Sequence, residues 1–152
     1  MKLDSQGCAI EYAKKIKELG IKQDSLFFWT YNLTSDEPYI IMLGGFNEKY
    51  HNEKISAFTI AELCKLLPIE FTKNEIVEFN GKKHSVLMRY HLKISRPPVA
   101  PDHWFCWYVG YAFDEYELQI AETSFSEIDK NMANACAKML IYLIENKILE
   151  LP

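Results

Sequence analysis

Residues 132–145 read MANACAKMLIYLIE, and the apolar side chains of this stretch recur every three or four positions. That spacing places them on one stripe of an α-helix, with Lys138 and Glu145 between them. The stripe consists of Met132, Cys136, Met139, Leu140, Leu143 and Ile144. A helix with one apolar stripe must cover another element, and strand-forming segments between residues 85 and 121 precede it directly. The sequence therefore predicts a C-terminal helix that packs on a sheet.

The strand that this helix is expected to cover reads WFCWYVGYAF at residues 104–113. Successive side chains of a strand point to opposite faces, and here both faces carry large apolar groups. Such a strand belongs in the middle of a sheet, with the helix on one face. Three alternatives stay open for the other face: the N-terminal strands cover it, a second copy of the chain packs on it, or it binds a ligand or stacked bases.

Local signals predict two further helices and several strands. Gly20 is the kind of residue that commonly ends a helix, and Thr59 and Glu62 have the spacing of a capping box. Asn80-Gly81 tolerates the positive φ of a tight hairpin turn. In chain order, the expected segments are a helix from Asp4 or Ser5 to about Leu19, strands at 26–31 and 39–43, a helix from Thr59 that ends before Pro68, strands at 76–79, 84–94, 104–113 and 116–121, and the C-terminal helix, beginning between Ser126 and Asn131.

Apolar and polar side chains alternate along residues 84–94, which indicates a strand with one buried face and favours an antiparallel sheet. The sequence therefore predicts an α+β fold with an antiparallel sheet of about five or six strands. The C-terminal helix packs on one face, and the other two helices lie at the edge or on the second face. Residues 1–152 are expected to form a single domain.

The composition and charge of the chain indicate which kinds of partner and which cellular location to expect. The chain has 152 residues, 49% of them hydrophobic and 25% charged, with a formal net charge of −4 at pH 7. Excess negative charge disfavours attraction to a phosphate backbone, so a nucleic acid is not an expected partner. The N-terminus lacks the apolar core of a signal peptide and no run is long enough to span a membrane, so a cytoplasmic location is expected. The four cysteines lie far apart in the sequence and are expected to be free thiols.

Few residue patterns in this sequence indicate catalysis or metal binding. His84 and His91 are seven residues apart on one expected strand and therefore point to opposite faces, which prevents them from binding one metal ion. Asp102 could orient the imidazole of His103 for base chemistry, which would make the protein an enzyme. No phosphate-loop, dinucleotide, hydrolase or metalloprotease fingerprint occurs. We therefore expect a protein that is not an enzyme, without catalytic residues, cofactor or metal ion.

Two blocks of the sequence carry a resemblance to other proteins. They are AFTIAELCKLLP at residues 57–68 and NMANACAKMLIYLIE at residues 131–145. They resemble a loose group of small phage and prophage proteins of gut Bacteroidetes, in which an FTxAELxxLLP helix, a tryptophan-containing strand and an AxAKMLIYLIE helix recur in that order. Residues 104–113 would be the strand, and the resemblance covers about the C-terminal two-thirds of the chain. It implies a phage-related origin in a bacterial host and no site residue, because the group carries no assigned activity.

Two functions follow from the doubly apolar strand. The first is a phage or prophage accessory protein that acts through protein contacts, as a homodimer or with a host or phage protein. The second is a small-ligand-binding or sequestering protein, whose pocket is walled by Trp104, Trp107, Tyr108 and Tyr111, with polarity from Arg89, His91 or His103. The candidate interface or ligand residues are Trp104, Phe105, Trp107, Tyr108, Tyr111, Arg89, His91 and His103.

Overall fold

The fold is known from a computed structural model, which describes residues 6–31, 38–42, 55–79, 81–113 and 119–150. Its elements, in chain order, are α1 (Ile10–Glu18), β1 (Phe27–Tyr31), β2 (Pro38–Met42), β3 (Ile55–Ser56), α2 (Ile60–Leu66), β4 (Glu70–Phe79), β5 (Lys82–Ser95), β6 (Trp104–Phe113), β7 (Gln119–Asp129) and α3 (Met132–Glu145).

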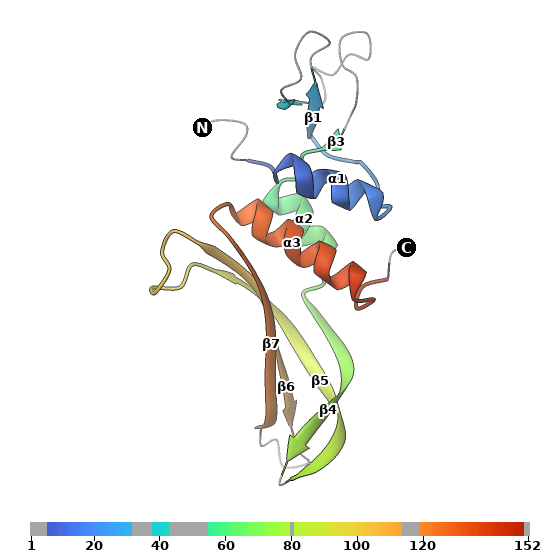
Figure 1. The fold of residues 1–152 in the computed structure, drawn as a ribbon, viewed down its shortest axis with the longest axis vertical. Helices are drawn as coiled ribbons and strands as arrows, with labels where there is room; N and C mark the ends of the chain where they lie inside the picture. Colours follow the sequence, from blue (N-terminus) through green and yellow to red (C-terminus); the bar gives the residue numbers. More distant parts are fainter. Residues whose placement is uncertain (1–5, 32–37, 43–54, 80, 114–118, 151–152) are drawn as a thin grey trace.

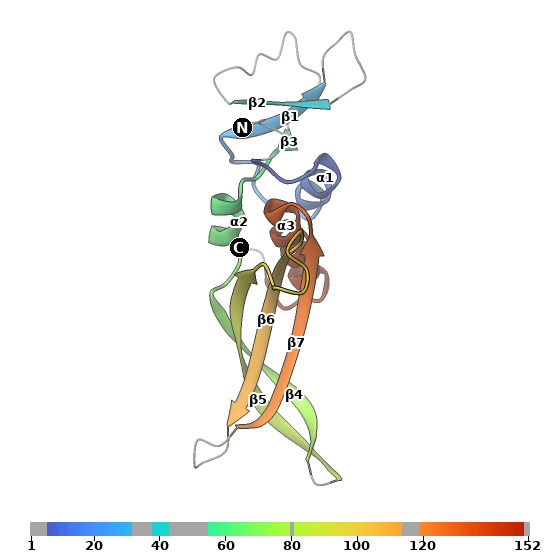
Figure 2. The same cartoon turned by 90° about the vertical axis from the view of Figure 1, so that its left-hand side faces the viewer.

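The strands form two antiparallel sheets on opposite sides of a layer of helices (Figures 1 and 2). The smaller sheet has the order β2-β1-β3, and the larger sheet is a meander with the order β4-β5-β6-β7. The α+β class is confirmed, as is the packing of α3 against a sheet, where it contacts β6 and β7. The strands are divided between two sheets where one was expected, because α2 carries the chain through the helical layer between β3 and β4.

The first helix begins later than its sequence signals indicate. Asp4 and Ser5, the expected caps, lie outside the described residues, and the helix starts at Ile10. The preceding segment is held extended, because the Cys8 N–H donates to the Phe58 carbonyl at 2.9 Å. The other end is as predicted: Gly20 has a φ of 87° and closes the helix.

The ends of α2 and α3 are fixed by side chains. Thr59 and Glu62 form the predicted capping box at the start of α2, and α2 ends before Pro68. The side chain of Asn131 accepts a hydrogen bond from the N–H of Ala133 and caps α3, while residues 124–129 continue β7. The start of α3 is therefore at the C-terminal limit of the predicted range.

The four-stranded sheet curls around the side chains that face α3. Phe71 on β4 and Phe125 on β7 belong to the two outer strands, yet their ring centroids are 6.2 Å apart. In a flat sheet, three strand spacings would separate these strands by about 14 Å. The rings of Tyr90 and Tyr108 lie between them, with Tyr90 4.9 Å from Phe71 and Tyr108 5.5 Å from Phe125. Tyr142 of α3 completes this aromatic cluster at 5.2 Å from Phe125.

The strand β6 lies between β5 and β7, as its two apolar faces predict. Cys106, Tyr108 and Ala112 point toward the helices and are buried in the core, together with Met139 and Leu140 of α3. The far end of the meander, including the turn at Gly81, extends beyond the helical layer (Figure 1). One face of β6 is thus covered by α3, and the other face is the surface considered next.

Candidate functional site

The face of the large sheet that points away from the helices carries an apolar row along β6. We call it the helix-free face and define its centre by Phe105, Trp107, Val109 and Tyr111. None of these four side chains belongs to the hydrophobic core that the helices share with the other face. The three aromatic side chains are half-buried, and Val109 is buried. Phe105 and Trp107 also contact each other, with ring centroids 6.1 Å apart.

Side chains of the neighbouring strands flank this row. In the register of the sheet, Arg89 lies opposite Tyr111, His91 opposite Val109, and Lys93 opposite Trp107. Long cationic side chains keep their charge in water and lay their aliphatic stems along apolar neighbours. Among the residues that the structure describes, the flanking side chains of the same sheet therefore account for the half-burial of the aromatic row.

The apolar character of the helix-free face extends to both sides of β6. Ile76 on β4 is 75% exposed, Leu87 on β5 is 60% exposed, and Ile128 on β7 is 42% exposed. Strand alternation and register place all three on this face, with Ile128 directly opposite Phe105. Ile76 and Leu87 lie at one end of this face and Ile128 at the other, with the apolar row of β6 between them. Apolar side chains exposed along one face of a sheet are typical of a binding surface.

The charges on the helix-free face are of both signs. Glu70 on β4 lies beside Arg89 and Lys93 on β5, and Glu78 lies opposite Lys83 at the other end of the strand pair. All five of these side chains are exposed. Glu70 is 3.6 Å from the Nδ1 atom of His91. The face is therefore apolar along its centre, with an acidic row and a basic row next to each other on one side.

The structure separates the aromatic residues that were expected to wall one pocket. Trp104 and Tyr108 point toward the helices, whereas Trp107 and Tyr111 point away from them. The hydroxyl of Tyr108 donates to the Pro68 carbonyl at 2.6 Å, and burial raises its pKa. The predicted ligand pocket is wrong, because successive side chains of a strand cannot line a common cavity.

The remaining predicted residues are also divided between the two faces and the turn before β6. Arg89 and His91 lie on the helix-free face with Phe105, while Trp104 packs under Arg96, whose guanidinium carbon is 4.3 Å from its ring centroid. His103 lies in the turn before β6, and its backbone N–H donates to the Ala100 carbonyl. No hydrogen bond or ion pair joins the side chains of Asp102 and His103, both of which the structure describes.

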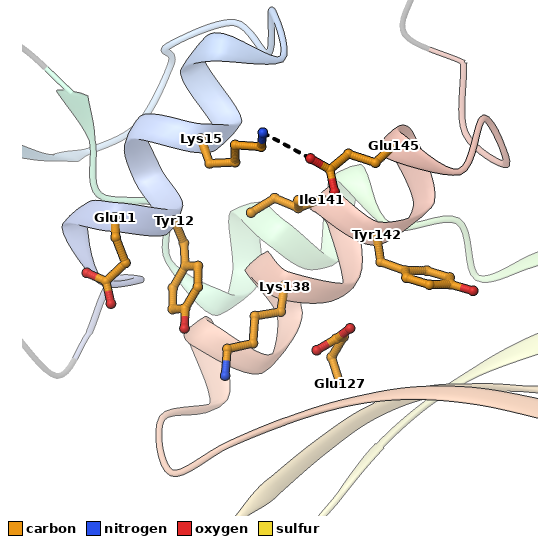
Figure 3. Close-up of a pocket in the computed structure, with 8 residues that line it drawn as sticks. All are labelled: Glu11, Tyr12, Lys15, Glu127, Lys138, Ile141, Tyr142 and Glu145. Carbon is orange, nitrogen blue, oxygen red and sulfur yellow. Dashed lines mark ion pairs between the residues drawn. The ribbon is translucent and has the colours of Figure 1, made fainter.

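A pocket of about 410 Å³ lies between α1, α3 and β7 (Figure 3). Tyr12 and Tyr142 stand on its two sides, Ile141 lies between them, and Glu127 enters from the sheet. It contains two lysines, and both are paired: Lys15 with Glu145 at 3.0 Å, and Lys138 with Asp129 at 2.8 Å. Glu11 and Glu127 complete the lining and pair with neither lysine.

Lys138 is the most strongly held of the polar groups in this pocket. It donates to the Ile128 carbonyl at 2.9 Å and lies 5.3 Å from the centroid of the Tyr12 ring. Burial lowers its pKa, but its hydrogen bonds to Asp129 and Tyr12 outweigh burial, and the pKa is raised. Lys138 therefore stays charged and remains paired with Asp129. The carboxylates of Glu11 and Glu127, which pair with neither lysine, favour a ligand that carries a positive group.

Sequence reasoning missed this pocket, because its tyrosines come from two helices at opposite ends of the chain. Tyr12 and Tyr142 each follow the helical period, and no local signal shows that they line the same pocket. Within the described ranges, no three His, Cys, Asp or Glu side chains are placed to hold a metal ion. In the same ranges no helix is long and apolar enough to cross a membrane.

Comparisons with known protein families, curated proteins and solved structures identified no relative of this chain. No protein-family model, no curated protein and no solved structure matches this chain. The function must therefore be argued from the two surfaces described above.

Proposed function

We propose that this is a non-enzymatic binding protein that acts through protein contacts, with the helix-free face as its binding surface and a second copy of the chain as its partner. The observation that carries the proposal is the aromatic row of β6 together with exposed Ile76, Leu87 and Ile128 on the same face. Removing such side chains from water on association is favourable by about 25 cal/mol per Å². The phage or prophage role that the sequence resemblance implies stays a prediction.

The charges of this face support a second copy as the partner. A two-fold interface brings a surface against itself, so a surface of one sign would repel its copy. The helix-free face has two carboxylates on β4 and three cations on β5, namely Lys83, Arg89 and Lys93, so each row has its complement in the partner. The sheet curls toward the helices, so the helix-free face is convex, and its central strands β5 and β6 contact the second copy first.

The test is the mass of the intact chain in solution. We expect light scattering at micromolar concentration to give the mass of a dimer. Replacing Leu87 or Ile128 with Lys places an unpaired charge in the interface and should raise the dimer dissociation constant at least about tenfold. Val99→Lys is the matched control, because Val99 is 93% exposed in the turn between β5 and β6 and should leave the mass unchanged. A monomer for the unmodified chain, or equal effects of the control and the two variants, overturns the proposal.

A second candidate function is binding of a small molecule in the pocket between α1, α3 and β7. Two tyrosines in the lining and the carboxylates Glu11 and Glu127 favour a compact apolar ligand with an amine. Thermal-shift screening against amine metabolites should then raise the melting temperature, and Glu127→Gln should remove the shift. Glu78→Gln, which removes an exposed carboxylate on β4 away from this pocket, serves as the control and should retain it.

A further inference from the structure

A second pocket, of about 500 Å³, lies between α2 and the segment that joins α1 to β1. We call it the loop pocket. Lys65 and Leu66 lie three and four residues after Glu62, so these side chains share one face of α2 and form one wall. Residues 20–24 contribute the other wall, including Ile21. The volume is within the range of small-molecule sites, about 300–1,000 Å³.

The joining segment is fixed against its neighbours by side-chain hydrogen bonds. The side-chain oxygen of Gln23 accepts from the Ser56 N–H at 2.9 Å. The Ser25 hydroxyl and the Leu26 N–H both donate to the Glu62 carboxylate. The walls of the loop pocket are therefore held in place without a ligand, which reduces the ordering cost of binding one.

The negative groups that line the loop pocket already have partners. Besides the two donors from the joining segment, the Glu62 carboxylate accepts from the Thr59 N–H at 2.7 Å and from the Thr59 hydroxyl at 2.8 Å. Asp24 pairs with Lys22 at 3.1 Å. The carboxylates of this pocket are thus occupied by the protein itself.

Lys65 is the positive group that differs from them. Its side chain is exposed and forms no hydrogen bond or ion pair with any other residue that the structure describes. Lys22 adds a second cation, because its pair with Asp24 has side chains that are 87% and 77% exposed and contributes little in water. The loop pocket therefore has donors to offer, while its acceptors are already used.

We propose that the loop pocket binds a small carboxylate with an apolar body, such as a medium-chain fatty acid. The apolar body lies against Ile21 and Leu66, which are half-buried, and leaves water on binding. The carboxylate accepts hydrogen bonds from the Lys65 ammonium. This site shares no lining residue with the pocket of Figure 3, whose unpaired groups are carboxylates and favour the opposite charge.

The test compares three ligands that have the same hydrocarbon chain and differ in charge: octanoate, octan-1-ol and octylamine. Each is titrated into the intact folded protein at pH 7, and the backbone amide shifts are followed by NMR. We expect octanoate to shift the amides of residues 20–24 and 58–66 most. The neutral alcohol and the cationic amine should bind there at least about fivefold more weakly, because neither can pair with Lys65.

Lysine variants test the role of the ammonium. Lys65→Met keeps an apolar stem of similar length on an exposed position, and it should raise the octanoate dissociation constant at least about fivefold. Lys65→Arg keeps the positive charge and should retain most of the affinity. The matched control is Lys82→Met, at an exposed lysine that begins β5 and lies outside this pocket, and it should leave the dissociation constant unchanged.

Three outcomes would overturn the inference. The first is octanoate that does not bind, or that shifts amides of the helix-free face instead of those around the loop pocket. The second is octylamine or octan-1-ol that binds at the loop pocket as tightly as octanoate. The third is a folded Lys65→Met variant with unchanged affinity. The loop pocket and the helix-free face share no residue, so this titration and the mass in solution can fail independently.

Discussion

The ring of Tyr90 lies against the backbone of Gly110, its partner on the neighbouring strand. A Cβ atom added to Gly110 would be 2.5 Å from the Cε1 atom of Tyr90. The ring cannot easily move away, because Phe71 stacks on it from the β4 side at an interplanar angle of 12°. Burial, together with the Glu75 carboxylate, raises the pKa of its hydroxyl. A glycine in the middle of a strand is explained here by the close approach of an aromatic ring.

Gly110→Ala should therefore destabilise the protein by about 1–3 kcal/mol, the usual cost of overpacking a core. The measurement is urea unfolding followed by tryptophan fluorescence. Combining Gly110→Ala with Tyr90→Leu tests the cause, because the smaller side chain leaves room for the new methyl group. The double variant should lose less stability than the two single variants together, and strict additivity would contradict the explanation.

Glu62 joins the start of α2 to the segment before β1. Its carboxylate accepts hydrogen bonds from the Thr59 N–H at 2.7 Å, the Ser25 hydroxyl at 3.0 Å and the Leu26 N–H at 3.1 Å. Burial raises the pKa of Glu62, but these hydrogen bonds outweigh it and lower the pKa.

We expect Glu62→Ala to reduce the free energy of unfolding by about 1–3 kcal/mol, because several donors lose their acceptor. Glu62→Gln keeps one acceptor oxygen and should lose less. Chemical denaturation of the two variants checks the order, and equal losses would show that the acceptor oxygens of Glu62 contribute little.

Asp129, just before the start of α3, makes a contribution to the free energy of unfolding that depends on pH. Its carboxylate accepts from Lys138 and from the Asn131 N–H, both at 2.8 Å, and from the side chain of Asn134 at 3.2 Å. Burial raises its pKa, but these donors outweigh burial and lower the pKa. A carboxyl whose pKa is lower in the folded state stabilises the fold above its unfolded pKa of about 3.9. That stability is lost as the pH falls through the folded value.

Asp129→Asn should accordingly be less stable than the unmodified chain by about 1–3 kcal/mol at pH 7, with a difference that shrinks below about pH 4. Unfolding by urea at a series of pH values measures this. Asp24→Asn is the control, because the Asp24–Lys22 pair has side chains that are 77% and 87% exposed and should contribute little. A difference for Asp129→Asn that does not change with pH would contradict the assignment.

Trp29 anchors the smaller sheet to the segment before α1. Its indole N–H donates to the Cys8 carbonyl at 2.8 Å, and both groups are buried. Trp29→Phe leaves that carbonyl without its donor and should cost about 1–3 kcal/mol. Thermal unfolding measures the loss, and a variant as stable as the unmodified chain would show that the carbonyl finds another donor.

The sequence predicted the features that depend on neighbouring residues. The capping box of Thr59 and Glu62 and the helix end at Gly20 are local, and the structure contains both. The alternation along residues 84–94 also holds, since Met88 and Tyr90 point into the core. Alternation also divides the side chains of β6 between two faces, but it does not specify which of the two α3 covers.

Features that depend on distant contacts could not be predicted in this way. The pairing of β3 with β1 joins Ile55 to Trp29, and no local pattern specifies such a partner. The late start of α1 depends on Phe58, which holds Cys8 in an extended segment. The pocket lined by Tyr12 and Tyr142 arises from the same long-range packing.

The position of the helices between the two sheets has a consequence for how the protein comes apart. Trp29 and Ile55 of the small sheet pack in the same hydrophobic core as the helices. Met88 and Tyr108 of the large sheet pack in that core as well. If the helices unfold, both sheets lose the apolar contacts that they make with this layer at the same time. Thermal unfolding of the described residues should therefore be one cooperative transition, in which both sheets unfold at the same temperature.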